Sequence, residues 1–453
     1  LSRIKAINTD VPVVMITKNE EENIMEEAIG AQIADYLIKP VKPNQILLAI
    51  KKILDNKKLV SEKTATSYRQ EFQNIMMELN NVNSHQEWAE LYRKLIYWEL
   101  ELEKADNPNM KNILDMQKAE ANKEFFKFIS KNYLKWLKEE GKDSTPTLSY
   151  TLFKDKVIPN LEKGVPTFFL LVDNLRYDHF KMIETLIKED FRKVSEDYFF
   201  SILPTTTQYS RNAIFSGLMP LDIDKKYPEK WFYDDENAGK NLHEEFFLNE
   251  QFKRNNISLK TSYTKITNHK SGKELEDTIL NLMNNDFNVI VYNFVDMLSH
   301  ARTEMEVLKE LASDEAAYRS LTLSWFDHSP LLNAIQKLKE KKVRIVITSD
   351  HGTMRVQNPS KIIGDKATTT NLRYKTGRNL NFNEKEVFYV KNPEEAMLPK
   401  SNLSSSYVFA KEDYYFCYPN NYNHFVNYYR NTFQHGGVSI EEVIVPVAIF
   451  ESK

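Results

Sequence analysis

The sequence predicts an α/β protein whose largest part is a doubly wound, mostly parallel sheet. Three observations lead to this fold class. Short apolar runs alternate with amphipathic runs over the last two thirds of the chain, and acidic residues directly follow three of the apolar runs. A polar stretch without glycine, residues 60–140, precedes this part, and two short strand–helix patterns precede that stretch. We therefore expect three domains, at residues 1–58, 59–150 and 151–453.

The composition is that of a folded globular protein. Hydrophobic residues make up 42% of the 453 residues and charged residues 28%, which excludes a disordered chain. The formal net charge of −3 gives no electrostatic reason to expect binding to duplex DNA. No apolar run approaches the roughly 18 residues that would cross a bilayer, so we expect no membrane partner. The single cysteine, Cys417, excludes an internal disulfide and favours a cytoplasmic location.

The first domain contains two strand–helix units. The segments 11–17 (VPVVMIT) and 34–40 (ADYLIKP) have the apolar character of buried strands. The segments 21–32 and 44–54 have the periodicity of amphipathic helices. The predicted order is therefore strand, helix, strand, helix.

These two units resemble the C-terminal half of a response-regulator receiver domain. On that resemblance, Thr17 corresponds to the switch threonine, Tyr36 to the switch aromatic residue, and Lys39 to the lysine that contacts the phosphoryl group. The acidic cluster and phosphoacceptor aspartate of a complete receiver do not precede these units, so we expect the first half of the domain to be missing. As written, the chain would not accept a phosphoryl group, but it would retain the face through which receivers of this class dimerise.

Residues 59–150 have the pattern of a small helical bundle. Apolar side chains recur every three and four residues in two stretches, and Asn107–Pro108 marks a turn between them. The two stripes are Trp88, Leu91, Leu95, Trp98 and Leu102, and Phe125, Phe128, Ile129, Tyr133, Trp136 and Leu137. We expect these side chains to form the core of a linker domain.

Strand-like and helix-like segments alternate from about residue 150. The expected strands are 167–173, 289–295, 343–348 and 386–390, with helices at 182–190 and 329–341. Two longer stretches, 220–285 and 355–430, show few clear periods, and we expect them to form cap insertions on the ligand side of the sheet.

Side chains suited to binding metal ions lie at or after the ends of the first three of these strands, and the segment FQHGG adds a histidine. The six residues are Asp173, Asp296, His300, Asp350, His351 and His435. Open α/β sheets bind ligands at the carboxyl ends of their strands, so we expect these side chains to meet there. Together they would hold two divalent cations, an arrangement that breaks phosphate esters.

A threonine-rich loop follows the first of these strands. Residues 203–217 begin with a proline turn, continue through Thr205, Thr206 and Thr207, and run toward Gly217 with helical character. A helix N-terminus favours a phosphate group. A threonine hydroxyl there would act as a nucleophile only with a base or a metal ion beside it. Taken alone, the three threonines are better explained as helix N-caps.

The order of these residues resembles that of the alkaline phosphatase superfamily. It consists of Asp173, a Pro-x-x-Thr loop, Asp296 with His300, Asp350–His351–Gly352, and His435, and it spans residues 165–453. The spacing is most similar to that of nucleotide pyrophosphatase/phosphodiesterases and PglZ domains. A receiver, a helical spacer and a PglZ domain in this order resemble the PorX-type response regulators of Bacteroidetes, which regulate type IX secretion.

The resemblance implies roles for the individual residues. One metal ion would be held by Asp173, Asp350, His351 and the oxygen of the nucleophile, and the other by Asp296, His300 and His435. The nucleophile would be Thr207, with Thr206 as the alternative one position away. Asn174, Arg176 and Arg211 would stabilise developing negative charge. Two Zn²⁺ ions are expected, with Mn²⁺ as the alternative.

The expected activity is hydrolysis of phosphodiesters, with a nucleotide or a short cyclic or linear oligonucleotide as substrate. The loop 366–378 carries Lys366, Arg373, Lys375 and Arg378 beside Tyr374, and it would either bind a second phosphate or a base, or form a solvated lid. A sulfatase is not expected, because the only cysteine lies far from the nucleophile position. The alternative function is a non-catalytic effector that binds metal and a phosphate ligand and signals through protein contacts.

The resemblance also implies partners. It implies a cognate sensor histidine kinase, a homodimer formed through the receiver domain, and a sigma factor as a further candidate.

Overall fold

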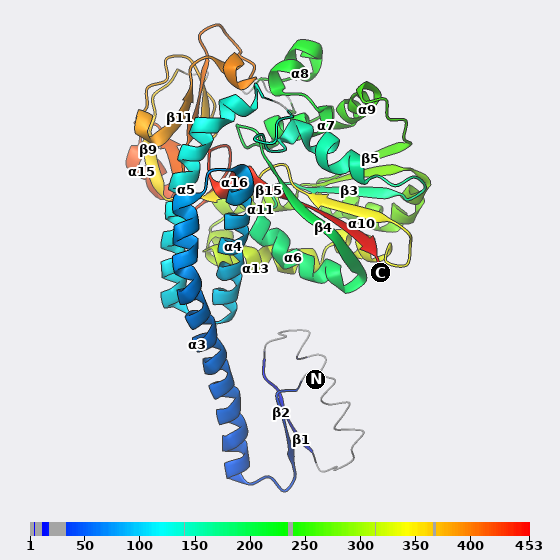
Figure 1. The fold of residues 1–453 in the computed structure, drawn as a ribbon, viewed down its shortest axis with the longest axis vertical. Coiled ribbons are helices and arrows are strands. Elements are labelled where there is room, and N and C mark those ends of the chain that lie inside the picture. Colours follow the sequence, from blue (N-terminus) through cyan, green and yellow to red (C-terminus); the bar gives the residue numbers. More distant parts are fainter. Residues whose placement is uncertain are drawn as a thin grey trace. The chain divides into compact units, whose positions relative to one another are not determined.

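The computed structural model describes residue 4 and residues 11–17, 33–139, 141–233, 239–312, 314–365 and 368–453. The chain divides into two compact units (Figure 1). The first comprises residues 1–77 and 97–116, and the second comprises residues 78–96 and 117–453. The expected helix at 21–32 and the expected site residue Lys366 lie outside the described residues.

The first unit contains a parallel strand pair and a long helix. Strand β1 (Val14–Thr17) pairs in parallel with β2 (Asp35–Ile38), as the two strand-like patterns predict. Thr17 ends β1 and Tyr36 lies in β2, whereas Lys39 follows β2 and is exposed. Helix α3 (Pro43–Asn81) then runs for 39 residues without a break, so residue 58 lies inside a continuous helix.

Two further helices complete the spacer and contribute to both units. They are α4 (His85–Lys104) and α5 (Pro108–Trp136), and the turn between them falls at Asn107–Pro108 as expected. In the first unit, the Tyr68 ring of α3 packs on Trp98 of α4 with centroids 5.5 Å apart. Among the helices that the structure describes, none combines the length and the apolar character that crossing a bilayer requires.

The second unit is built around a six-stranded sheet. Its strand order is β4 (Phe191–Phe200), β15 (Ile444–Ser452), β7 (Arg344–Thr348), β3 (Thr167–Val172), β6 (Phe287–Tyr292) and β5 (Thr261–Ile266). The neighbours β7, β3, β6 and β5 are parallel, and only β15 runs antiparallel to the strands beside it. Every residue of β3 and β6 is buried, which fits their mainly apolar sequences. The predicted α/β class with a mostly parallel sheet is confirmed.

Helices cover both faces of this sheet. In Figure 1, α7 (Asn212–Ser216) and α9 (Glu244–Arg254) lie above it, and α6 (Tyr177–Asp190) and α13 (Glu315–Asp327) lie below it. The other helices between β5 and β7 are α10 (His269–Thr278), α11 (Phe294–Glu304), α12 (Glu306–Leu311) and α14 (Pro330–Gln336). Layers of helices on both faces are the arrangement expected of a doubly wound fold.

The insertion after β7 forms small sheets of its own. Strands β10 (Tyr374–Gly377), β12 (Ser406–Ala410) and β11 (Val387–Val390) make an antiparallel sheet. The expected strand at 386–390 therefore exists as β11, but it pairs with β12 and is not part of the main sheet. Two-stranded sheets join β13 (Tyr414–Cys417) to β9 (Asn358–Lys361) and β14 (Phe433–Gln434) to β8 (Met354–Arg355). Three short helices complete the unit, α8 (Pro220–Lys226) in the earlier insertion, α15 (Tyr422–Tyr429) and α16 (Ile440–Val443).

Two of the described cationic side chains of the loop at 366–378 are internal to this insertion, whereas Arg378 is exposed. Arg373 is buried and forms two hydrogen bonds to Glu442, at 3.1 and 2.6 Å. Lys375 is also buried and donates to the Thr369 carbonyl at 2.7 Å. The expectation that these two residues face a ligand or solvent is therefore wrong, because the fold uses them to hold the insertion together.

The C-terminal part of α5 packs against the segment that leads to Thr207. Phe125 and Trp136 of α5 contact the Phe200 ring at centroid distances of 6.2 and 5.6 Å. The Tyr133 hydroxyl accepts a hydrogen bond of 2.9 Å from the backbone N–H of Leu203. The spacer thus fixes the start of the threonine loop.

We expect the Tyr133→Phe substitution to destabilise the second unit by about 1–3 kcal/mol, because the buried Leu203 N–H loses its acceptor. Urea unfolding monitored by circular dichroism would measure the change. Tyr389→Phe is the matched control: the Tyr389 side chain is exposed, and its change should stay within about 0.5 kcal/mol. Equal losses for both variants would contradict the importance of this contact.

The hydrogen bonds around Glu196 of β4 make a contribution to stability that depends on pH. Glu196 of β4 accepts hydrogen bonds from Tyr177 at 2.6 Å, from Lys181 at 3.1 Å and from Lys193. Partial burial opposes ionisation, but the hydrogen bonds from Lys193 and Tyr177 prevail and lower the pKa of Glu196 from 4.5 to about 2. A lowered carboxyl pKa stabilises the fold above pH 4.5, and this contribution is lost as the pH falls toward 2.

We therefore expect Glu196→Gln to have a lower free energy of unfolding than the wild type at pH 7, and we expect this difference in free energy to be smaller at pH 3. Urea unfolding of both proteins at the two pH values would test this. The exposed Glu340 provides the matched control, since Glu340→Gln should follow the wild type at both pH values. A gap that stays constant between pH 7 and pH 3 would count against the charged network.

Candidate active site

The first cluster of expected ligands lies where two neighbouring parallel strands end. Asp173 directly follows β3, and Asp350 and His351 lie just beyond β7. Because β3 and β7 pair in parallel, their carboxyl ends meet at the same edge of the sheet. The structure brings the three side chains together, with one ligand atom of each within 4.8 Å of the others, and all three are buried. We call this the strand-end group.

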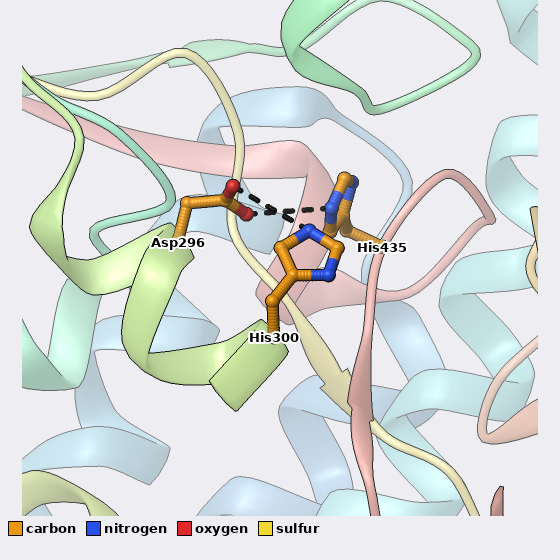
Figure 2. A group of neighbouring side chains, drawn as sticks. All are labelled: Asp296, His300 and His435. Carbon is orange, nitrogen blue, oxygen red and sulfur yellow. Dashed lines mark ion pairs between the residues drawn. The ribbon is translucent and has the colours of Figure 1, made fainter. Parts of the chain in front are cut away.

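The second cluster is formed by a helix and a loop. Asp296 and His300 lie four residues apart on α11, which places them on one face of that helix. His435 reaches them from the segment after β14. Figure 2 shows the three side chains pointing toward one another, with both histidine Nε2 atoms 3.5 Å from an oxygen of Asp296. We call this the helix group.

The two groups are adjacent. The rings of His351 and His435 stack with centroids 4.4 Å apart. Asn174 joins the groups, since its backbone N–H donates to Asp350 at 3.2 Å and its side chain donates to Asp296 at 3.4 Å. This double contact requires a sharp turn directly after Asp173, and Asn174 supplies it with a φ of 64°, a conformation that asparagine tolerates better than most residues. The six expected ligands therefore converge in space.

The three threonines of the loop point in different directions. Thr207 lies at the site, with its hydroxyl 3.3 Å from Asp173 Oδ1 and 3.2 Å from His351 Nε2. Thr205 bonds to Gly436 and Gly437, both at 3.0 Å, and so fixes the loop that carries His435. The buried hydroxyl of Thr206 has no hydrogen-bond partner among the described residues.

The tautomer of His351 follows from its second contact. Its Nδ1 lies 3.0 Å from the Gly352 carbonyl oxygen, which can only accept, so Nδ1 carries the proton. In the neutral ring, the lone pair therefore belongs to Nε2, the nitrogen that faces Thr207. Glycine is required at 352, because a Cβ there would lie 2.0 Å from the carbonyl oxygen of Glu441. The backbone around Gly352 therefore determines which nitrogen faces the site.

Both arginines proposed from the sequence are buried and paired. Arg211 contacts Asp173 and also Asp350, the latter at 2.9 Å, and its Nη1 donates to Asn293 at 3.2 Å. Arg176 pairs with Asp178 and with Glu315, the latter at 2.6 Å. The guanidinium groups therefore lie among carboxylates and not on an open surface.

The charges of the strand-end group are strongly coupled. Burial raises the pKa of Asp173 well above its usual value, and the neighbouring carboxylates of Asp350 and Asp296 add to this effect against the opposing charge of Arg211. Burial also acts to raise the pKa of Asp350, but Arg211 and His351 outweigh it and hold the pKa at about 2. Burial, and then the nearby His351 and His300, lower the pKa of His435, which keeps this imidazole neutral.

The donor sets suit divalent cations. The strand-end group offers two carboxylates and one imidazole, and the helix group offers one carboxylate and two imidazoles. Three protein ligands of oxygen and nitrogen with room for one more are typical of catalytic zinc sites. His300 remains 63% exposed, so the helix group is open to solvent on one side. The candidate Asp/His metal site therefore has the ligands and the access that a reacting group needs.

Several residues that shape the site were not expected from the sequence. Ser349 accepts a hydrogen bond from the Leu175 N–H at 2.8 Å and donates to the His351 carbonyl at 2.9 Å, which ties the ends of β3 and β7 together. Glu244 lies 3.7 Å from Arg211. A serine after an apolar strand and a glutamate at a helix start are too common to indicate such roles.

Comparisons with known proteins fit this geometry. The model of a family described as the BREX system PglZ alkaline phosphatase-like domain matches residues 152–450. A second model, described as the PorX response regulator linker domain, matches residues 58–137. No curated protein matches the chain.

Solved structures of two ectonucleotide pyrophosphatase/phosphodiesterases are similar to parts of the chain. The murine protein 5 of this group covers 62% of this chain and 87% of its own, with 10% identity and a TM-score of 0.41. The human protein 5 gives the same coverage and identity with a TM-score of 0.38. Likeness at this level says nothing about the substrate of this chain.

The first family match covers well over half of the chain and contains all six expected ligands. The alkaline phosphatase-like fold belongs to a superfamily of metal-dependent phosphoester hydrolases. The chain therefore belongs to the PglZ alkaline phosphatase-like family, and it joins this domain to a PorX-type response-regulator linker.

Proposed function

We propose that this protein is a response regulator whose effector domain hydrolyses phosphodiesters with Thr207 as the nucleophile. The observation that carries the proposal is the position of the Thr207 hydroxyl, which lies 3.3 Å from Asp173 Oδ1 and 3.2 Å from His351 Nε2. A nucleophile needs such activating neighbours. Thr206 does not have them, which favours Thr207 over its neighbour.

The two groups of ligands would each hold one divalent cation, with Zn²⁺ favoured over Mn²⁺ by the share of imidazole ligands. When bound, a pair of such ions stabilises the attacking and leaving oxygens of an in-line displacement at phosphorus. Asp173 and His351 hold the Thr207 hydroxyl at the strand-end group, where a bound cation would lower the pKa of that hydroxyl and so activate it. Asn174 holds Asp350 and Asp296 in register across both groups.

The arginine pairs favour a diester over a monoester. A phosphate monoester carries an additional anionic oxygen, which usually calls for a free guanidinium in the site. Arg211 and Arg176 instead neutralise carboxylates of the protein. A diester with a single negative charge requires less compensation, and we propose a nucleotide or a short cyclic or linear oligonucleotide as the substrate.

The linker supports a signalling role. Its family description names a response regulator, so we propose that a sensor histidine kinase controls the chain through a receiver domain that includes residues 1–58, with phosphorylation favouring a homodimer. By the same reasoning we propose a part in type IX secretion and a sigma factor as a further partner. In this proposal Thr17, Tyr36 and Lys39 belong to the receiver switch.

We expect Thr207→Val to reduce hydrolysis of bis-p-nitrophenyl phosphate at least about a thousandfold, because valine has the shape of threonine but no hydroxyl. Absorbance of released nitrophenol measures the rate. Thr206→Val is the matched control, since this neighbouring hydroxyl makes no hydrogen bond to described residues and should be dispensable for the reaction. The assignment of the nucleophile fails if Thr207→Val keeps the wild-type rate. A wild-type protein that binds metal without turnover on any diester would favour the non-catalytic effector.

Elemental analysis should find about two divalent ions per folded chain after dialysis against metal-free buffer. We expect His300→Ala to retain about one, because the helix group loses a ligand while the exposed position leaves the fold intact. His424→Ala is the matched control, because His424 is an exposed histidine of α15 that belongs to neither group of expected ligands, and this variant should retain both ions. A metal content that is the same in all three proteins would exclude His300 as a ligand.

A further inference from the structure

A pocket of about 400 Å³ lies beside the candidate metal site. Its walls come from the ends of β5 and β6, the starts of α10 and α14, and from α11 and α13. This volume falls in the range of small-molecule sites, roughly 300–1,000 Å³. The pocket also lies at the carboxyl ends of parallel strands, where sheets of this type bind their ligands.

Three aromatic rings form one wall of the pocket. Trp325 of α13 stacks on Phe294 of α11, with centroids 3.9 Å apart and planes 6° from parallel. Tyr292, the last residue of β6, packs against the same indole at 5.4 Å. Phe294 covers one face of Trp325 and so holds its plane in place. Rigid aromatic surfaces of this kind favour a flat ring as the occupant.

The pocket also contains a polar group, the hydroxyl of Tyr292. Tyr292 is only 5% exposed, and its hydroxyl makes no hydrogen bond to the described residues. Burial raises the pKa of Tyr292 to about 12, so the hydroxyl stays protonated and can donate. A wholly apolar occupant would leave this hydroxyl unpaired at a cost in free energy. His269 and Thr267, both exposed at the rim, offer further polar contacts.

The pocket and the candidate metal site share one short segment. Asn293 lies between the pocket residues Tyr292 and Phe294, and its side chain accepts a hydrogen bond from Arg211. Met297 lines the pocket directly after the expected ligand Asp296. Phe294 and Met297 lie on a different face of α11 from Asp296 and His300, so a single helix separates the two sites.

We propose that this pocket binds a nucleobase. A base has two flat faces for the aromatic wall and a polar edge for the Tyr292 hydroxyl, a combination that neither an aliphatic chain nor a bare phosphate offers. The base belongs either to the phosphodiester that the chain cleaves or to a free nucleotide that regulates it. The assignment of the pocket to a nucleobase does not rest on the proposed function. Only the question of which of these two molecules carries the base rests on it.

Titration calorimetry of the whole chain with adenosine and with uridine tests the pocket directly. Neither nucleoside contains phosphate, so binding does not require the metal groups. We expect Trp325→Leu to weaken nucleoside binding about tenfold or more, because a stacking surface is lost. Thr267→Trp should block binding by filling the pocket from its exposed rim. Thr278→Trp, the same substitution at the exposed C-terminal end of α10, should bind as the wild type does.

The proposal is overturned if neither nucleoside binds at millimolar concentrations, or if Trp325→Leu and Thr267→Trp both bind like the wild type.

The dinucleotide ApA then distinguishes a base that belongs to the substrate from a base that belongs to a regulatory nucleotide. If the base belongs to the substrate, Trp325→Leu raises KM for ApA more than it lowers kcat, and adenosine competes with ApA. If it belongs to a regulator, adenosine changes turnover of bis-p-nitrophenyl phosphate without competing. A protein that binds adenosine but cleaves no diester would sink the proposed hydrolysis and leave the pocket assignment standing.

Discussion

The site depends on the concentration of negative charge where three adjacent parallel strands end. Asp173 and Asp350 are buried. Asn174 connects Asp350 to Asp296, because its backbone N–H donates to the first and its side chain donates to the second. Buried carboxylates are costly unless cations and hydrogen bonds compensate them. A single guanidinium, that of Arg211, pairs with both buried aspartates, and Glu244 shares it at a longer distance. The carboxylates outnumber this cation, which gives the site a demand for further positive charge that bound metal ions would meet.

The surrounding structure keeps these charges in place. Ser349 ties the ends of β3 and β7 together, and Thr205 fixes the loop of His435. From the other side, the spacer helix α5 holds the start of the threonine loop through Tyr133, and Asn122 bonds both to the Ile440 N–H at 2.8 Å and to Glu441 at 3.0 Å. The helical spacer is therefore part of the framework of the site, so a change in α5 is able to reach Thr207 through only a few contacts.

Features that depend on local pattern are predictable from the sequence, and features that depend on distant partners are not. Mainly apolar runs predict β3, β6 and β7, and the carboxylates after them converge because parallel strands end at one edge. The burial of Arg373 was not predictable, since its partner Glu442 lies 69 positions away in the sequence. The sequence also did not indicate that strand 387–390 belongs to a separate sheet, because a local pattern does not identify its pairing partner β12.

The three threonines of the loop show the same limit of prediction from local pattern. Three identical side chains in a row have identical local signals, and only the backbone direction at Thr206 and Thr207 separates a buried hydroxyl from one at the site.

Helix α11 links the two ligand-binding features of the molecule. One of its faces carries Asp296 and His300, and another face forms a wall of the aromatic pocket through Phe294 and Met297. The residue just before the helix, Asn293, bonds to Arg211, which pairs with both buried aspartates. Packed elements respond to a contact by moving as units, because their interiors have no free volume to absorb it. An occupant that packs on Phe294 would therefore contact the same helix that positions Asp296, so α11 is the structural element through which the pocket is able to influence the helix group.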